Sequence, residues 1–151
     1  MNLMYKVINL KKEFIFSLSL LLSGCNSSIS TEDKGEIYQK KWLDKNIQSY
    51  SFNYKETGFT PIAGDKWEIQ VADGKVIYVN YVGSGNPDPS LNQDSAPTID
   101  LLFKRIIDCE DKSSCKVTLV EFDQINFHPV QYHASYGVEG EGFQVSHFIV
   151  Q

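Results

Sequence analysis

The sequence predicts an α+β fold in which an antiparallel sheet of about six strands carries two helices packed on one of its faces. Two segments have apolar residues at the spacing of an amphipathic helix, and several others alternate apolar and polar residues, which is the period of a half-buried strand. Short turn signals separate neighbouring strand segments, and strands joined by tight turns pair antiparallel. The expected order of elements is helix, three strands, helix, three strands.

The first element is a helix predicted over residues 32–48. This segment contains no proline, and its apolar side chains form a loose helical stripe of Ile37, Tyr38, Trp42, Leu43 and Ile47. Ser30 or Thr31 is placed to cap the helix, and Glu32 and Asp33 suit the positive end of its dipole. We expect the aromatic residues of this stripe to belong to the core rather than to a ligand platform.

Three strands are predicted next. Alternating residues indicate strands over residues 50–55 and 67–71, separated by a loop that contains Gly and Pro. Asp73-Gly74 predicts the hairpin turn into the third strand, because Gly tolerates the left-handed backbone of such turns. The third strand, residues 75–82, is apolar on both faces, which is typical of a strand that is central or covered on each side.

Residues 83–97 are polar, contain three prolines and are predicted to form a long loop. Side chains with oxygen ligands stand at every second position, as in a calcium loop: Asn86, Asp88, Ser90, Asn92 and Asp94. The central Gly and the closing Glu of an EF-hand are absent, and two prolines interrupt the series. We therefore interpret this segment as a solvated connector rather than as a calcium site.

A second helix is predicted to begin after Thr98, which is a suitable N-cap. Its apolar residues fall at i, i+3, i+4 and i+7 and form a stripe of Ile99, Leu102, Phe103 and Ile106. We expect this helix to end near Cys109.

Three further strands are predicted over residues 116–123, 130–136 and 143–150. Turn residues Asn126, His128 and Pro129 separate the first two, and a loop containing Gly137, Gly140 and Gly142 separates the last two.

The N-terminal segment has the layout of a secretory signal peptide. Lys6, Lys11 and Lys12 precede an apolar run over residues 14–22, and small polar residues follow it. This run is shorter than the roughly 20 residues that a membrane-spanning helix needs. The sequence Leu22-Ser23-Gly24-Cys25 at its end resembles the lipobox of bacterial lipoproteins.

The lipobox resemblance implies that the Cys25 thiol carries a diacylglyceryl group and that cleavage makes Cys25 the new N-terminus. We therefore expect a signal peptide over residues 1–24, a tether over 25–31 and a single α+β domain over 32–151. An ordinary signal peptide in which Cys25 has no role is the alternative. Asn26 after the cysteine resembles lipoproteins that are sorted to an outer membrane, where the organism has one.

The chain is acidic, with 14 Lys and Arg residues against 19 Asp and Glu residues. Removal of the basic signal segment would leave a net charge of about −7. This charge argues against a nucleic-acid partner, which requires a clustered basic face. It also argues against adhesion to anionic lipid, so the acyl group would have to supply the membrane attachment.

Cys109 and Cys115 are separated by five residues. An exported protein folds in an oxidising compartment, so we interpret this pair as a disulfide. A redox-active or metal-binding pair is the alternative, but the spacing matches neither a thioredoxin-type motif nor a zinc knuckle.

The residue types that carry catalysis are present without a diagnostic spacing. His128, His133 and His147 would suit zinc or copper if the fold brought them together, but no His-x-His or His-Glu-x-x-His motif requires this. No Gly-x-Ser-x-Gly elbow is present for a nucleophilic serine. An envelope hydrolase or a metal-binding protein that uses this histidine region is therefore the alternative to a non-catalytic role, and no cofactor is predicted.

A one-sided sheet leaves a polar face to receive a protein or glycan of the cell envelope. The candidates for this binding face are Gln131, His133 and Ser135, or their neighbours Tyr132 and Tyr136, together with His147. A register shift of one residue exchanges the two sets.

Four stretches resemble the DUF6174 family of bacterial lipoproteins and secreted proteins. They are the junction Trp42–Tyr54, the hairpin Val71–Val76, the helix with Leu102-Phe103, and Val120-Glu121-Phe122-Asp123 followed by Pro129. Gly58-Phe59-Thr60 stands where the family often has a cysteine pair, and Asn126 or a neighbour stands where Gly is usual. The resemblance covers most of the expected domain and implies no particular activity.

Together these features predict a lipid-anchored protein of the cell envelope, with its domain in the periplasm or at the surface, that acts as a binding or structural module.

Overall fold

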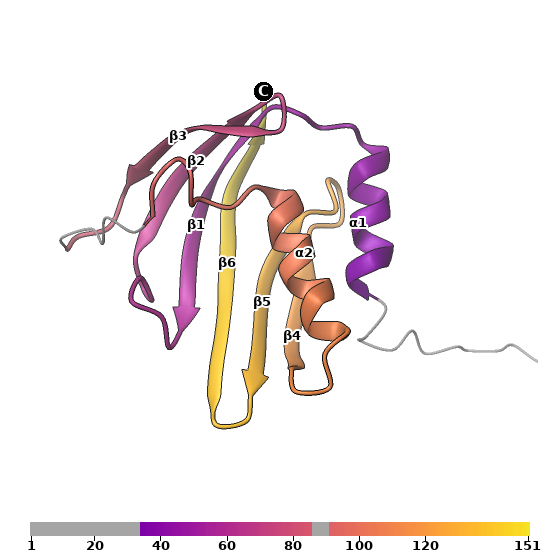
Figure 1. Ribbon diagram of the computed structural model, residues 1–151. Helices are drawn as coiled ribbons and strands as arrows, with labels where there is room; N and C mark the ends of the chain where they lie inside the picture. The colour runs from indigo at the N-terminus through magenta and orange to yellow at the C-terminus, as the bar shows by residue number, and fades with distance from the viewer. Residues whose placement is uncertain (1–33, 86–90) are drawn as a thin grey trace, which may run out of the picture.

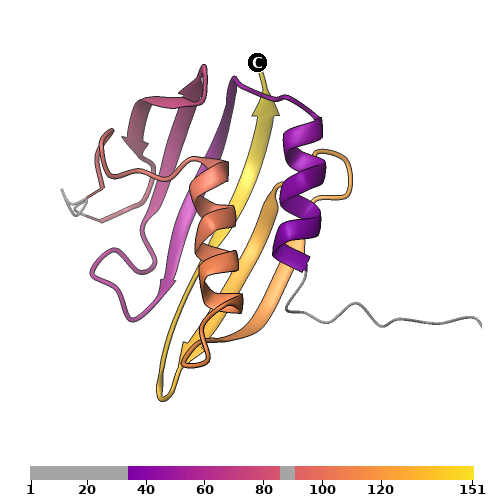
Figure 2. The ribbon, with the colours of Figure 1, turned by 45° about the vertical axis from the view of Figure 1, so that its right-hand side comes forward.

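The computed structural model describes residues 34–85 and 91–151, and it places two helices on one face of a six-stranded antiparallel sheet (Figures 1 and 2). The strand order is β3-β2-β1-β6-β5-β4. The elements are α1 (Lys34–Asp44), β1 (Tyr50–Gly58), β2 (Lys66–Ala72), β3 (Lys75–Tyr81), α2 (Ile99–Glu110), β4 (Lys116–Phe122), β5 (Pro129–Tyr136) and β6 (Glu139–Val150). The predicted fold class and element order are confirmed. Neither of these two helices is long and apolar enough to cross a membrane.

In the first half of the sheet, a loop joins β1 to β2 and a tight turn joins β2 to β3, as the sequence predicts. β1 pairs with β2 so that Tyr54 stands opposite Trp67. β2 then turns into β3 through Asp73 and Gly74, whose φ angles are 50° and 72°. Both values lie in the left-handed region, which glycine and aspartate tolerate better than most residues.

The sheet consists of two halves, β1–β3 and β4–β6, and the pairing of β1 with the C-terminal strand β6 joins them. Asn53 stands opposite Ser146, and Lys55 stands opposite Gln144. A β-bulge interrupts the pairing near His147, whose φ angle is 53°. The last strand of the chain therefore lies at the middle of the sheet, between β1 and β5 (Figure 1).

The core lies between the sheet and the helices. β1 contributes Tyr50, Phe52 and Tyr54, whose side chains alternate with outward-facing polar residues. From α2, the predicted stripe is buried against them, and Phe103 and Ile106 are fully inaccessible to solvent. Each side chain of this size stabilises the fold by about 2 kcal/mol through burial.

The start of α2 is held to both the sheet and α1. The Thr98 hydroxyl accepts a hydrogen bond from the Leu101 amide, which confirms the predicted N-cap. The Ile99 amide donates to the Tyr50 hydroxyl at 3.0 Å. The indole Nε1 of Trp42 donates to Asp100 at 2.9 Å, so the buried tryptophan of α1 also binds the first turn of α2.

α1 ends earlier than the expected boundary at residue 48. At its C-terminal end, the Lys45 amide donates a hydrogen bond to the Trp42 carbonyl, and the Asn46 amide donates one to the Leu43 carbonyl. Asn46 then takes a φ angle of 50°, which terminates the helix. Residues 32 and 33 lie outside the described residues.

The expectation that residues 75–82 form a central or doubly covered strand is wrong. β3 is an edge strand, and its outer side chains Ile77 and Tyr78 are 51% and 45% exposed. Only its other side is covered, in part by the loop that follows, in which Leu91 and Ala96 are buried. A run of apolar residues indicates burial on both faces only where a layer packs on each face, and both helices of the described residues lie on one face of this sheet (Figure 1).

The glycine-rich loop before β6 is shorter than expected, because Gly140 and Gly142 belong to the strand. Only residues 137 and 138 form the turn, with Gly137 at φ 72°. A Cβ atom at position 142 would lie 2.8 Å from the Thr57 hydroxyl and 3.1 Å from the His133 Cα. Glycine is therefore needed here for close strand packing rather than for a loop.

Candidate functional site

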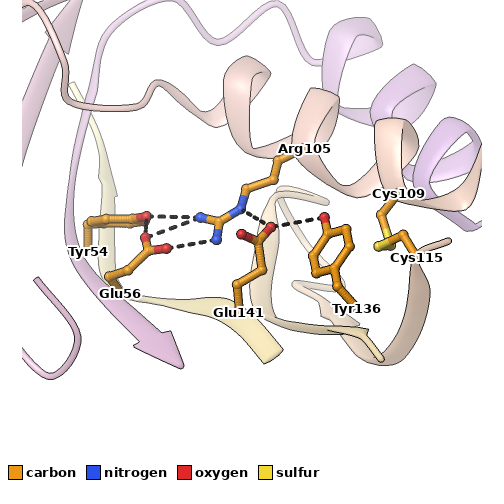
Figure 3. A network of polar contacts seen from close by, with 7 residues as sticks. All are labelled: Tyr54, Glu56, Arg105, Cys109, Cys115, Tyr136 and Glu141. Carbon is orange, nitrogen blue, oxygen red and sulfur yellow. Dashed lines mark hydrogen bonds and ion pairs between the residues drawn. A yellow bond between two sulfur atoms is a disulfide. The ribbon is translucent and has the colours of Figure 1, made fainter. Parts of the chain in front are cut away.

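Arg105 of α2 lies at the centre of a polar network that joins the helix to the sheet (Figure 3). Its guanidinium reaches Glu56 of β1 through two bonds, of 2.7 Å to Oε1 and 3.1 Å to Oε2. Its Nε atom donates to Glu141 of β6 at 3.2 Å. One cation on α2 thus bridges carboxylates from the two central strands.

Two tyrosines complete the network. The Tyr54 hydroxyl donates to Oε2 of Glu56 and accepts a weaker bond of 3.4 Å from Arg105. The Tyr136 hydroxyl donates to Glu141 at 3.2 Å. Figure 3 shows the five side chains in one row, with the disulfide of α2 beyond Tyr136.

The electrostatics of the network are dominated by Glu56, which is only 5% exposed. Burial raises the pKa of its carboxyl group above the ordinary value of 4.5, while the bonds and charge of Arg105 oppose that rise. Both oxygens of Glu56 are occupied by Arg105 and Tyr54. A carboxylate with both oxygens engaged is arranged to hold α2 against β1 rather than to transfer a proton.

A cleft of about 460 Å³ opens beside this network, between α2, β1 and the connecting loops. Tyr54, Glu56 and Arg105 of the network line this cleft together with apolar and polar neighbours. The other lining residues are Thr60, Pro61, Ile62, Leu91, Ser95, Pro97, Leu101 and Leu102. The Oγ1 atom of Thr60 is buried and has no hydrogen-bond partner within residues 34–85 and 91–151. The cleft has room for a small ligand beside the network.

The face of the sheet opposite the helices carries two adjoining grooves of about 350 and 310 Å³. The first groove is lined by residues of four strands, and its polar side chains stand beside apolar surface that includes Val130 and Val145. These polar side chains are Asn53, Lys55, Lys66, Gln131, Gln144 and Ser146. The second shares Asn53 and Lys66 with it and extends to Glu68 and His147. We call this uncovered surface the open face.

The structure does not bring the three histidines to one place. His128 is buried against Phe148, with ring centroids 4.1 Å apart, and burial lowers its pKa to about 4. His133 lies on the open face and contacts the Thr118 hydroxyl through Nδ1 at 2.8 Å. His147 lines the second groove. Within the described part of the chain, no three His, Cys, Asp or Glu side chains are grouped to hold a metal ion.

The residues of the predicted binding face are divided between the two sides of the sheet. Tyr132 is completely buried on the helix side, and Tyr136 binds Glu141 on that same side. His133 and His147 lie on the open face. Of the two sets that a register shift exchanges, the one containing Gln131 and His133 points outward.

Of the remaining candidate residues, the structure describes the cysteine pair and part of the calcium-like series. Cys109 and Cys115 form a disulfide that links the end of α2 to the approach to β4. Cys25 lies outside the described residues, as do residues 86–90 of the calcium-like series. In the described part of that series, the Asn92 side chain accepts bonds from the Asp94 and Ser95 amides, so it caps a local turn.

Sequence reasoning did not identify the Glu56–Arg105–Glu141 network. One signal was present, because Glu56 continues the inward positions of Tyr50, Phe52 and Tyr54 along β1. A carboxylate at an inward position requires a buried partner. The partners could not be named, because they come from two elements far away in the chain.

Comparison with known proteins identifies a family but no activity. A family model described as "Family of unknown function (DUF6174)" matches residues 35–138. This range extends from α1 to the turn before β6. No curated protein and no solved structure matches the chain.

Proposed function

The chain belongs to the DUF6174 family, and on that premise we propose that it is a membrane-anchored lipoprotein of the cell envelope whose domain is a non-catalytic binding module. The observation that supports the binding role is the open face, where two adjoining grooves lie on the side of the sheet opposite α1 and α2 (Figure 2). The grooves combine apolar surface with polar side chains from several strands, which is the composition of concave binding sites.

The anchor rests on the N-terminal sequence. A basic start, an apolar run and Leu22-Ser23-Gly24-Cys25 provide the features of a lipoprotein signal. The disulfide between Cys109 and Cys115 supports export, because such bonds persist in oxidising compartments. One acyl chain gives only marginal attachment, so the stable form requires at least two chains on Cys25.

The saturation of the polar network argues against catalysis at that site. Glu56 has the carboxyl group whose pKa is raised by burial, which is a common property of catalytic acids. Its two oxygens are nevertheless held by Arg105 and Tyr54, and Glu141 is shared by Arg105 and Tyr136. These groups are therefore assigned to holding the helix layer on the sheet.

The anchor is tested by cell fractionation of a Cys25→Ser variant. Wild-type protein is expected in the membrane fraction, and Cys25→Ser is expected in the soluble fraction because it lacks the acylated sulfur. Ser27→Ala is the matched control and should remain with the membrane. Unchanged partitioning of Cys25→Ser would refute the anchor.

The non-catalytic role is tested by incubating the purified protein with model esters, glycosides and peptides. No turnover above a heat-denatured sample is expected. Turnover that disappears in a Glu56→Gln variant would instead assign an enzymatic role to the network beside the cleft.

A further inference from the structure

We propose that Lys55 and Lys66 form a carboxylate-binding subsite on the open face, and that its ligand is an extended acidic segment of a partner protein. This inference rests on the proposed binding function, which it deepens by naming the site and the chemistry of the ligand.

The two lysines form a cross-strand pair. Lys55 of β1 stands directly opposite Lys66 of β2. Their neighbours Tyr54 and Trp67 are buried on the helix side, so alternation directs both lysine side chains to the open face. Both lysines line the same groove.

This arrangement is electrostatically unfavourable in the absence of an anion. Like charges directly opposite each other on a sheet are destabilising. Lys55 and Lys66 are half-buried, and within residues 34–85 and 91–151 neither ammonium group forms an ion pair. The chain as a whole carries a net charge of −5, so this pair is a local positive site on an acidic protein. A bound carboxylate would relieve the repulsion between the two cations.

The surroundings of the pair favour a peptide as the carrier of that carboxylate. Asn53, Gln131 and Gln144 line the same groove, and each side-chain amide offers both donors and an acceptor, as the peptide backbone does. Among residues 34–85 and 91–151, none presents an aromatic ring to this groove on which a sugar could stack, because the ring of Tyr54 is buried on the helix side. Ser146, which stands opposite Asn53, adds a hydroxyl group to this groove.

The groove has the size of a short extended segment. Its lining residues come from β2, β1, β6 and β5, which are consecutive in the sheet. Three strand intervals span about 14 Å, which corresponds to about four residues of extended chain. Glu68 in the adjoining groove would repel a second carboxylate, so the acidic side chain of the ligand is directed to the lysine pair.

Fluorescence polarisation of a labelled peptide tests this subsite. The full chain, purified in a non-ionic detergent, is titrated against a short peptide of alternating Glu and Gly residues. A Lys55→Gln/Lys66→Gln variant should raise the Kd by about tenfold or more, since it removes both cations. Lys75→Gln changes the same charge outside both grooves and should leave the Kd unchanged. The matching Gln-Gly peptide should not bind, and added salt should weaken the binding of the Glu-Gly peptide.

Several outcomes would overturn the proposal. If the double variant binds the peptide as tightly as wild type, the ligand lies elsewhere on the domain. If acetate displaces the peptide at the same molar concentration that unlabelled peptide requires, the pair binds only simple anions. If anionic vesicles compete better than the peptide, the ligand is a lipid surface. Absence of peptide binding by wild type would also refute the subsite. These outcomes concern the subsite alone. Failure of the proposed anchor would be seen in the fractionation of Cys25→Ser, and a catalytic role would be seen as turnover of the model substrates.

Discussion

Acidification should destabilise the domain through His128. This side chain is 5% exposed, packs against Phe148, and has a buried Nδ1 atom with no hydrogen-bond partner in the described part of the chain. Burial lowers its pKa from the ordinary 6.5 to about 4, although the charge of Asp123 opposes this effect. In the folded protein His128 is therefore neutral at pH values where the unfolded chain has already bound a proton.

The magnitude follows from this difference in pKa. Between pH 6.5 and about 4 the unfolded chain binds more protons at this position, so the free energy of unfolding falls as the pH falls. Each pH unit in this window corresponds to about 1.4 kcal/mol, and the whole window to roughly 3 kcal/mol. The contribution is fully present above pH 6.5 and is lost by about pH 4.

Urea denaturation followed by tryptophan fluorescence measures this loss, because Trp42 and Trp67 are both buried in the folded state. His128→Phe keeps a ring against Phe148 and removes the titrating group. The difference in unfolding free energy between wild type and His128→Phe isolates the histidine, because Glu56, whose raised pKa acts with the opposite sign, is present in both proteins.

We expect this difference to shift by about 1 kcal/mol between pH 7 and 5.5 and by roughly 3 kcal/mol between pH 7 and 4, always against the wild type. A difference that stays constant over this range would show that His128 is not held neutral by burial, and would refute the reasoning.

Two further substitutions test the contacts of α2. Arg105→Met should lower the free energy of unfolding by about 3 kcal/mol, because it leaves Glu56 buried without a cation. Lys104→Met removes only an exposed ion pair and should cost less than about 1 kcal/mol, so equal losses for the two variants would contradict the role of the network. Replacing both Cys109 and Cys115 by Ser should cost about 2 kcal/mol, since the disulfide closes a short loop. Alkylation of unreduced wild-type protein should label neither of these cysteines, and labelling of either one would contradict the disulfide.

The sequence predicted correctly those features that depend only on residues close together in the chain. The stripe of α2 and its Thr98 cap are encoded within one short segment, and the structure confirms both. The Asp73-Gly74 turn is likewise a local property, because its backbone angles require particular residues.

The order of the sheet could not be derived in this way. The pairing of β1 with β6 joins segments from opposite ends of the domain, and no local pattern specifies it. The edge position of β3 was missed for the same reason. Its residues Ile77 and Tyr78 are apolar, but whether a layer covers them depends on where both helices pack.

The two candidate sites also depend on long-range pairing. Arg105 meets Glu56 and Glu141 only after α2 packs over the central strands. Lys55 and Lys66 become a pair through the register of β1 and β2. An alternating pattern shows which residues share a face of a strand, but it does not show which residue of the next strand stands opposite. Residue types were therefore visible in the sequence, whereas their partners were not.

Mass spectrometry of the protein isolated from its native membrane tests the proposed anchor most directly. The predicted result is a chain that begins at Cys25, with the mass of at least two acyl chains on this residue. A chain that retains residues 1–24, or one whose Cys25 carries an unmodified thiol, would contradict the proposed lipoprotein.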